Sequence, residues 1–80
     1  MSDIKERVAS CFSNVFPELS KEEIERASTS SLAAWDSLAQ VTLLSAIAEE
    51  FGQPFELGDF EELVSYSLIV DHLENTARNA

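Results

Sequence analysis

The chain has 80 residues, 15 of them Asp or Glu and only five Lys or Arg, so its formal net charge at pH 7 is −10. This length suits one small domain, and its limited burial argues against an enclosed, water-free active site. The excess of acids disfavours DNA, RNA and anionic membranes as partners, because Lys and Arg bind phosphate groups. The apolar fraction of 45% argues against disorder, so a folded domain is expected. A basic patch on another protein would complement the negative charge, but most of the acids are expected only to keep a small domain soluble.

No segment resembles a targeting or membrane sequence. Residues 1–7 are mostly polar, and no apolar run approaches the ~20 residues that span a bilayer. We therefore expect a soluble, cytoplasmic protein. Cys11 is the only cysteine, which excludes an intramolecular disulfide and a Cys-rich metal site. No Asp-x-Asp-x-Asp-Gly calcium loop occurs either, so no metal site is predicted.

The first predicted helix covers about residues 3–15. At ~100° per residue one face is apolar, and it carries Ile4, Val8, Cys11, Phe12 and Val15. Cys11 is thus expected to be a small core residue. A long connection follows, because Pro17 is poorly suited to continue the helix.

The connection between about residues 17 and 35 contains one ordered feature. Ser20 and Glu23 form a capping-box pattern, which predicts a short helical turn over residues 21–26, and residues 27–31 are expected to be irregular. Connections of this length are uncommon in small domains and often carry function. Three apolar residues are expected to hold the connection against the core: Leu19, Ile24 and Leu32.

The second predicted helix covers about residues 37–51 and ends at Gly52. Its expected core stripe is Val41, Leu44, Ile47, Ala48 and Phe51, with Leu43 at one margin. The opposite face carries Ala39, Thr42, Ser45, Ala46 and Glu49. Leu38 falls on this second face, so the periodicity predicts that it is exposed.

Two further helices complete the expected fold. Asp59 is predicted to cap a short helix over residues 60–64, and Ser65 a final helix whose last residues, 76–80, should fray. The final helix has a regular core stripe: Tyr66, Ile69, Val70 and Leu73. The sequence therefore predicts one all-α domain over residues 1–80. We expect a small four-helix bundle of three longer helices and a short third one, with a long loop between the first two.

The tripeptide Asp36-Ser37-Leu38 lies at the predicted start of the second helix. A serine there lies among backbone N–H groups without intrahelical partners, where the helix dipole favours a negatively charged substituent. Ser37 is therefore a candidate attachment point for a phosphate-linked group, and Asp36 a candidate N-cap. Trp35 has two open interpretations: a loop anchor packed on the helix, or an aromatic surface that partners contact.

Catalysis by the chain itself is not expected. A Ser37 and His72 pair could serve as nucleophile and base only if their helices met, and the pattern gives no sign of this. No nucleophile elbow, phosphate-binding Gly-rich loop or zinc spacing occurs. His72 lies beside the core stripe of the last helix, so a boundary histidine is the expected role.

The segment Trp35-Asp36-Ser37-Leu38, followed by AQVTLLSAIAEEFG over residues 39–52, resembles the signature of acyl carrier proteins. The resemblance extends over the whole chain, because the order and length of the predicted helices and the acidity also agree. A Trp before the Asp resembles specialised stand-alone carriers more than the general fatty-acid carrier, which usually has Gly-Ala there.

This resemblance implies that Ser37 receives 4′-phosphopantetheine from coenzyme A, transferred by a separate Mg²⁺-dependent phosphopantetheinyl transferase. Asp36 would meet that enzyme and its metal, and Leu38 would give partner enzymes an apolar contact. An acyl cargo would be held as a thioester on the arm, for a fatty-acid, polyketide or other specialised biosynthetic pathway. Peptidyl or aminoacyl cargo is the close alternative, and a helical interaction domain without a prosthetic group is the second.

The partners implied are the transferase, an acyl-loading ligase or transferase, and a ketosynthase or other pathway enzyme; a monomer is the simplest expectation. The predicted docking residues are Trp35, Leu38, Ala39, Thr42 and Glu49. Fatty-acid carriers typically have acids where this chain has Ala39 and Thr42, which suggests dedicated partners that dock by fit more than by charge. A cargo pocket between the second and third helices would be lined by Val41, Leu44, Ile47, Phe60, Leu63 and Tyr66.

Overall fold

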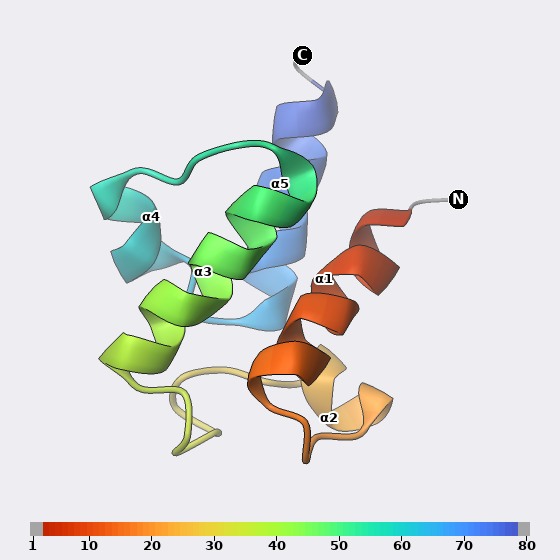
Figure 1. Cartoon of the computed structure of the whole chain (residues 1–80), viewed down its shortest axis with the longest axis vertical. Helices are drawn as coiled ribbons and strands as arrows, with labels where there is room; N and C mark the ends of the chain where they lie inside the picture. Colours follow the sequence, from red (N-terminus) through yellow and green to blue (C-terminus); the bar gives the residue numbers. More distant parts are fainter. Residues whose placement is uncertain (1–2, 79–80) are drawn as a thin grey trace.

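The computed structural model describes residues 3–78, and this part of the chain contains five helices and no strand (Figure 1). The helices are α1 Asp3–Val15, α2 Lys21–Glu25, α3 Ser37–Phe51, α4 Leu57–Glu62 and α5 Tyr66–Arg78. The all-α prediction is therefore confirmed, with the predicted turn after Ser20 forming a short helix of its own. None of these five helices has both the length and the apolar character needed to cross a membrane.

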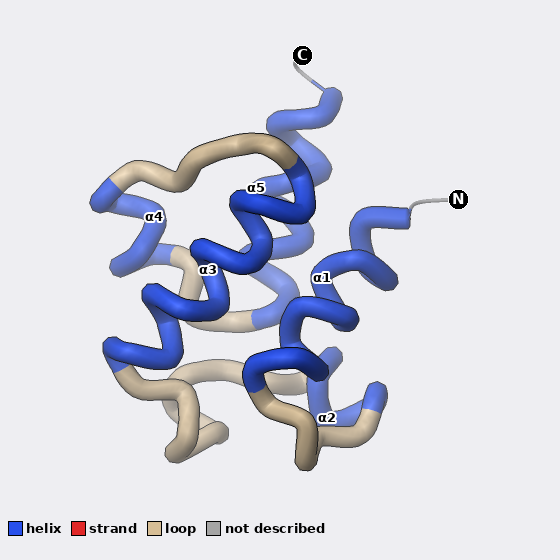
Figure 2. The backbone as a smooth tube through the Cα atoms, in the orientation of Figure 1, coloured by secondary structure: helices blue, strands red, loops and turns tan. Residues whose placement is uncertain are grey.

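Three longer helices surround one core, with α1 packed against both α3 and α5. The short α2 lies against α1 and α5, and α4 lies against α3 (Figures 1 and 2). The buried apolar residues form one cluster: Val8, Cys11, Phe12, Phe16, Ile24, Ala27, Trp35, Leu43, Leu44, Ile47, Leu63, Tyr66, Ile69, Val70 and Leu73. The predicted core faces of α1 and α5 and the predicted core role of Cys11 are thus confirmed. Burial raises the pKa of the Cys11 thiol.

The connection between α1 and α3 is ordered by local hydrogen bonds. The Ser20 hydroxyl accepts a hydrogen bond from the backbone N–H of Glu23, and the Glu23 carboxylate accepts one from the backbone N–H of Ser20, which completes the predicted capping box. Ile24 is buried, and Leu19 and Leu32 pack against the core at half-buried positions, as expected. The connection is therefore held to the core at three points along its length.

Backbone hydrogen bonds join this connection to the turn before α5. The N–H of Thr29 donates to the carbonyl of Val64 at 2.9 Å, and the N–H of Tyr66 donates to the carbonyl of Ala27 at 3.1 Å. Residues 27–31, predicted to be irregular, form a turn in which the N–H of Leu32 also donates to the carbonyl of Ser28. The long loop is thereby fixed beside the end of α4.

The core stripe predicted for α3 is correct at Leu44 and Ile47 and wrong at Val41. Gln40, Leu43, Leu44 and Ile47 are buried, whereas Val41, predicted to lie in the core, is 50% exposed. The end of the helix is as expected, because Gly52 adopts the left-handed conformation with φ of 66°. The stripe begins one residue earlier than predicted, because a polar residue, Gln40, occupies the core position that was expected for Val41.

The predicted start of α4 is also wrong. The helix begins at Leu57, and Asp59 lies inside its first turn, where its carboxylate accepts a hydrogen bond from the backbone N–H of Glu56 at 2.9 Å. Asp59 therefore accepts from a residue that precedes it in the chain, and it does not cap a helix over residues 60–64. Ser65 caps α5 as predicted, since its hydroxyl accepts from the N–H of Leu68. Helix α5 includes residues 76–78 of the segment predicted to fray, and residues 79–80 lie outside the described part.

Candidate functional site

The N-terminus of α3 presents Ser37 on the surface. Asp36 is the N-cap, and its carboxylate accepts a hydrogen bond from the backbone N–H of Ala39 at 2.9 Å. Ser37 is the first helical residue and is exposed, and Leu38 next to it is 76% exposed. The motif therefore consists of a capping aspartate, as predicted, followed by an exposed serine and an exposed leucine.

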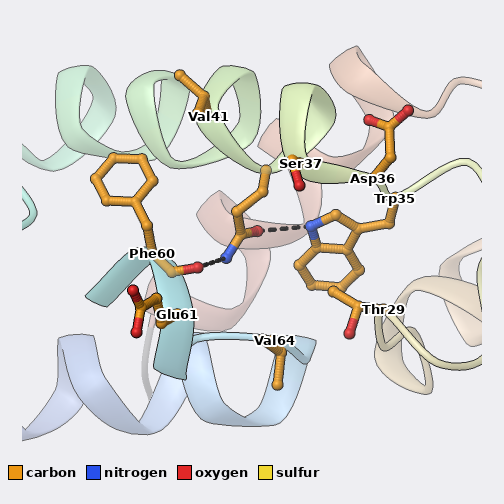
Figure 3. Close-up of a pocket in the computed structure, with 9 residues that line it drawn as sticks. Thr29, Trp35, Asp36, Ser37, Val41, Phe60, Glu61 and Val64 are labelled. Carbon is orange, nitrogen blue, oxygen red and sulfur yellow. Dashed lines mark hydrogen bonds between the residues drawn. The ribbon is translucent and has the colours of Figure 1, made fainter. Parts of the chain in front are cut away.

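A groove of about 630 Å³ opens beside Ser37, between α3, α4 and the ordered connection (Figure 3). It is open to solvent, and its lining mixes apolar and polar side chains. The lining residues are Thr29, Trp35, Asp36, Ser37, Gln40, Val41, Phe60, Glu61 and Val64. Ser37, the predicted attachment residue, thus lines an open groove with room for part of an attached group.

A hydrogen-bond network forms the floor of this groove. The indole N–H of Trp35 donates to Oε1 of Gln40 at 2.6 Å, and Nε2 of Gln40 donates to the carbonyls of Phe60 at 3.0 Å and Leu63 at 2.8 Å. Figure 3 shows the bonds that lead from Trp35 through the glutamine to Phe60. One side chain thereby joins the residue before the motif to the last turn of α4.

Trp35 is an anchor in this structure. Its side chain is only 2% exposed, and its ring packs edge-on against Phe12, with a centroid separation of 5.2 Å. Phe16 and Tyr66 complete the aromatic cluster around Phe12. Of the two interpretations left open by the sequence, burial favours the loop anchor over an exposed surface that partners contact.

The remaining predicted docking residues divide by exposure. Leu38, Thr42 and Glu49 are exposed, but Ala39 is half-buried and packs against the core. The Thr42 hydroxyl donates to the carbonyl of Leu38 at 3.1 Å, so it is partly engaged by its own helix. The exposed face of α3 after the motif is therefore narrower than the sequence predicted.

The six residues predicted to line a cargo pocket divide between the groove and the core. Val41 and Phe60 line the groove, but the other four predicted residues are core residues with 5% exposure or less: Leu44, Ile47, Leu63 and Tyr66. Four lining residues were not predicted from the sequence: Thr29, Gln40, Glu61 and Val64. For Gln40 a signal was present, because it lies three, four and seven residues before Leu43, Leu44 and Ile47, in phase with the true stripe.

Ser37 and His72 do not lie in one site. The imidazole of His72 packs against the ring of Phe55, with centroids 5.6 Å apart, and its Nε2 is 4.0 Å from the Asp59 carboxylate. His72 is not among the residues that line the groove beside Ser37. Over residues 3–78, no three His, Cys, Asp or Glu side chains gather in an arrangement suited to a metal ion.

Comparison of the whole chain with protein families, with curated proteins and with solved structures finds no significant match.

Proposed function

We propose that the chain is a carrier that holds acyl groups as thioesters on a 4′-phosphopantetheine arm attached to Ser37. One observation carries the proposal: an exposed serine is the first residue of a 15-residue helix, between a capping aspartate and an exposed leucine, at the mouth of a groove. The resemblance of residues 35–52 to the acyl carrier signature names the attached group.

The chemistry at Ser37 is a transfer to its hydroxyl. Oγ forms a bond to a phosphorus of coenzyme A, the bond from that phosphorus to the nucleotide half breaks, and the hydroxyl proton leaves to a base of the transferase. The product is a phosphodiester with one negative charge. The N-terminal end of α3 favours this charge, because its first N–H groups and the helix dipole point toward it. Asp36 and Leu38 lie beside the reacting serine and are proposed contacts for the transferase and later partners.

The attachment is tested by incubating the chain with coenzyme A, Mg²⁺ and a broad-specificity phosphopantetheinyl transferase. We expect an intact-mass increase of one phosphopantetheine unit, and none for Ser37→Ala. Ser45→Ala is the matched control, because Ser45 is another exposed serine on α3 that does not line the groove. This variant should gain the same mass as the wild-type chain.

The absence of a mass increase, with a transferase shown to modify another carrier, would contradict the proposal. It would favour a helical interaction domain without a prosthetic group, for which the exposed Leu38 and the 88% exposed Leu57 are candidate contacts. Peptidyl or aminoacyl cargo would use the same arm and remains the alternative cargo. It is distinguished by which ligase, acyl or aminoacyl, loads the modified chain.

A further inference from the structure

The amide of Gln40 is a buried polar group at the boundary between the groove and the core. The residue is 6% exposed, between the groove and the buried side chains of α3. Both hydrogens of its Nε2 are donated to carbonyls at the end of α4, and its Oε1 accepts from the indole of Trp35. Both donor hydrogens of the amide are therefore occupied by the protein itself.

These bonds close the space between α3 and α4 behind the groove. To pass deeper, an apolar chain would have to separate Gln40 from the carbonyls of Phe60 and Leu63. It would offer no hydrogen bond in return, because methylene groups neither donate nor accept. Leaving buried donors and acceptors unsatisfied costs more than the loss of the bonds alone.

We propose that Gln40 determines how this carrier holds its cargo: it keeps an acyl chain out of the helical core, so that the thioester stays accessible at any chain length. The inference rests on the proposed attachment at Ser37. Gln40 is a positioning residue here, because it acts by holding Trp35 and the end of α4 in place. The carrier thus presents cargo outside its core, in contact with the open groove at most.

The test compares a short and a long cargo on the full-length wild-type chain. The transferase loads Ser37 from acetyl- and octanoyl-coenzyme A, intact mass measures the loading, and hydroxylamine then cleaves each thioester. A sequestered thioester reacts only through its exposed fraction. For an accessible one we expect the two cleavage rates to agree within about twofold.

Gln40→Leu removes the amide and puts an apolar side chain of similar size in its place. In this variant we expect octanoyl cleavage to be at least about fivefold slower than acetyl cleavage, because the chain can now enter between α3 and α4. Gln53→Leu is the matched control, since it makes the same change at the other glutamine, outside the groove lining. Gln40→Met serves as a second variant should Gln40→Leu fail to fold.

A second readout reports the network directly. Trp35 is the only tryptophan, so the chain has one indole N–H signal in a nitrogen-15 spectrum. We expect this signal to keep its position between acetyl- and octanoyl-loaded wild type, and to shift in the Gln40 variants. A change in fold stability alone would not produce a difference between the two cargoes.

The failures of the two proposals are distinguishable. No mass increase would overturn the attachment at Ser37 and the inference with it. Loading followed by slow octanoyl cleavage in the wild-type chain would overturn the exclusion of cargo alone. Equal acetyl and octanoyl rates in both Gln40 variants would show that Gln40 is not the residue responsible and would also overturn the inference.

Discussion

Asp36 fixes the position of the first turn of α3 and therefore the place of Ser37. Its carboxylate accepts a hydrogen bond from the N–H of Ala39, and its own carbonyl accepts one from the N–H of Gln40 at 2.8 Å. A residue at this position satisfies one of the N–H groups that the helix leaves without an intrahelical partner. The serine that follows is held on a fixed turn, with its hydroxyl exposed.

Replacing Asp36 should measure this capping role. We expect Asp36→Ala to lower the free energy of unfolding by about 1 kcal/mol, as is typical when a capping side chain is lost. Chemical denaturation followed by circular dichroism gives the value. Asp36→Asn is the control, because Asn is also a good N-cap and should retain most of the stability. Equal losses in both variants would mean that the charge, not the cap, stabilises α3.

Gln40 shows why the first core position of α3 was predicted incorrectly. From a hydrophobicity pattern an amide side chain is predicted to lie on the surface, because burying an amide without hydrogen-bond partners costs free energy. Here the amide is paired with the indole of Trp35 and with the carbonyls of Phe60 and Leu63, which lie 20 and 23 residues further along the chain. Those partners exist only once α4 packs against α3, so the local pattern could not reveal them.

Helix ends that depend on residues close together in the sequence were predicted correctly for α2 and α3. The capping box of α2 needs only Ser20 and Glu23, and the left-handed end of α3 needs only Gly52. The predicted start of α4 was wrong, although the residues that determine it are also close together in the sequence. Asp59 is suited both to begin a helix and to close its first turn, and the observed choice uses the backbone N–H of Glu56.

The α2 capping box gives a pH-dependent contribution to stability. Hydrogen bonds from Ser20 hold the pKa of the Glu23 carboxyl below its usual value. A lowered folded-state pKa means that the contribution is fully present above the unfolded value, about 4.3, and is lost as pH falls through the folded one. We expect the stability difference between wild type and Glu23→Gln to be largest near neutral pH and to shrink in this acidic range.

Denaturation of both proteins at a series of pH values measures this difference. The carboxyl titration of Glu23, followed by nuclear magnetic resonance, gives its folded-state pKa directly. Glu22→Gln is the matched control, because Glu22 is exposed in the same first turn but is not the acceptor of the Ser20 N–H. A pH-independent difference for Glu23→Gln would contradict the prediction.

At the scale of the whole molecule, the charge works against the compact state. The net charge is −10, and exposed acids repel one another across a small surface. Arg7 offsets this in one place: its guanidinium donates to the Glu50 carboxylate at 2.8 Å and lies 4.2 Å from the centre of the Phe51 ring. Both ends of this ion pair are substantially exposed, so it contributes little in comparison with the repulsion.

Salt should therefore stabilise the chain. Screening acts over about 10 Å at 0.1 M ionic strength, which weakens the repulsion between acids more than it weakens one exposed ion pair. We expect the melting temperature to rise by several degrees on adding salt, because about 1 kcal/mol corresponds to about 4–8 °C in a domain of this size. Thermal melts at low and high sodium chloride measure the shift.

A variant with two fewer charges provides the control. Glu6→Gln combined with Glu18→Gln removes two exposed acids that line neither the groove nor the α3 N-terminus. Its melting temperature should depend less on salt than that of the wild type. A melting temperature that falls with salt would mean that ion pairs, not repulsion, dominate the electrostatics of the folded state.

The amino-acid sequence alone was enough to predict the helical class, the extents of α1 and α3, the start of α5, the caps formed by Ser20, Asp36 and Ser65, and the exposure of Leu38. All of these follow from periodicity or from hydrogen bonds that reach only a few residues along the chain. The burial of Gln40 in place of Val41, the burial of Trp35 and the lining of the groove emerge only from the folded structure. These depend on the contact of α3 with α4 and with the connection before it, because the partners of Gln40 and Trp35 come from segments that only the fold brings together.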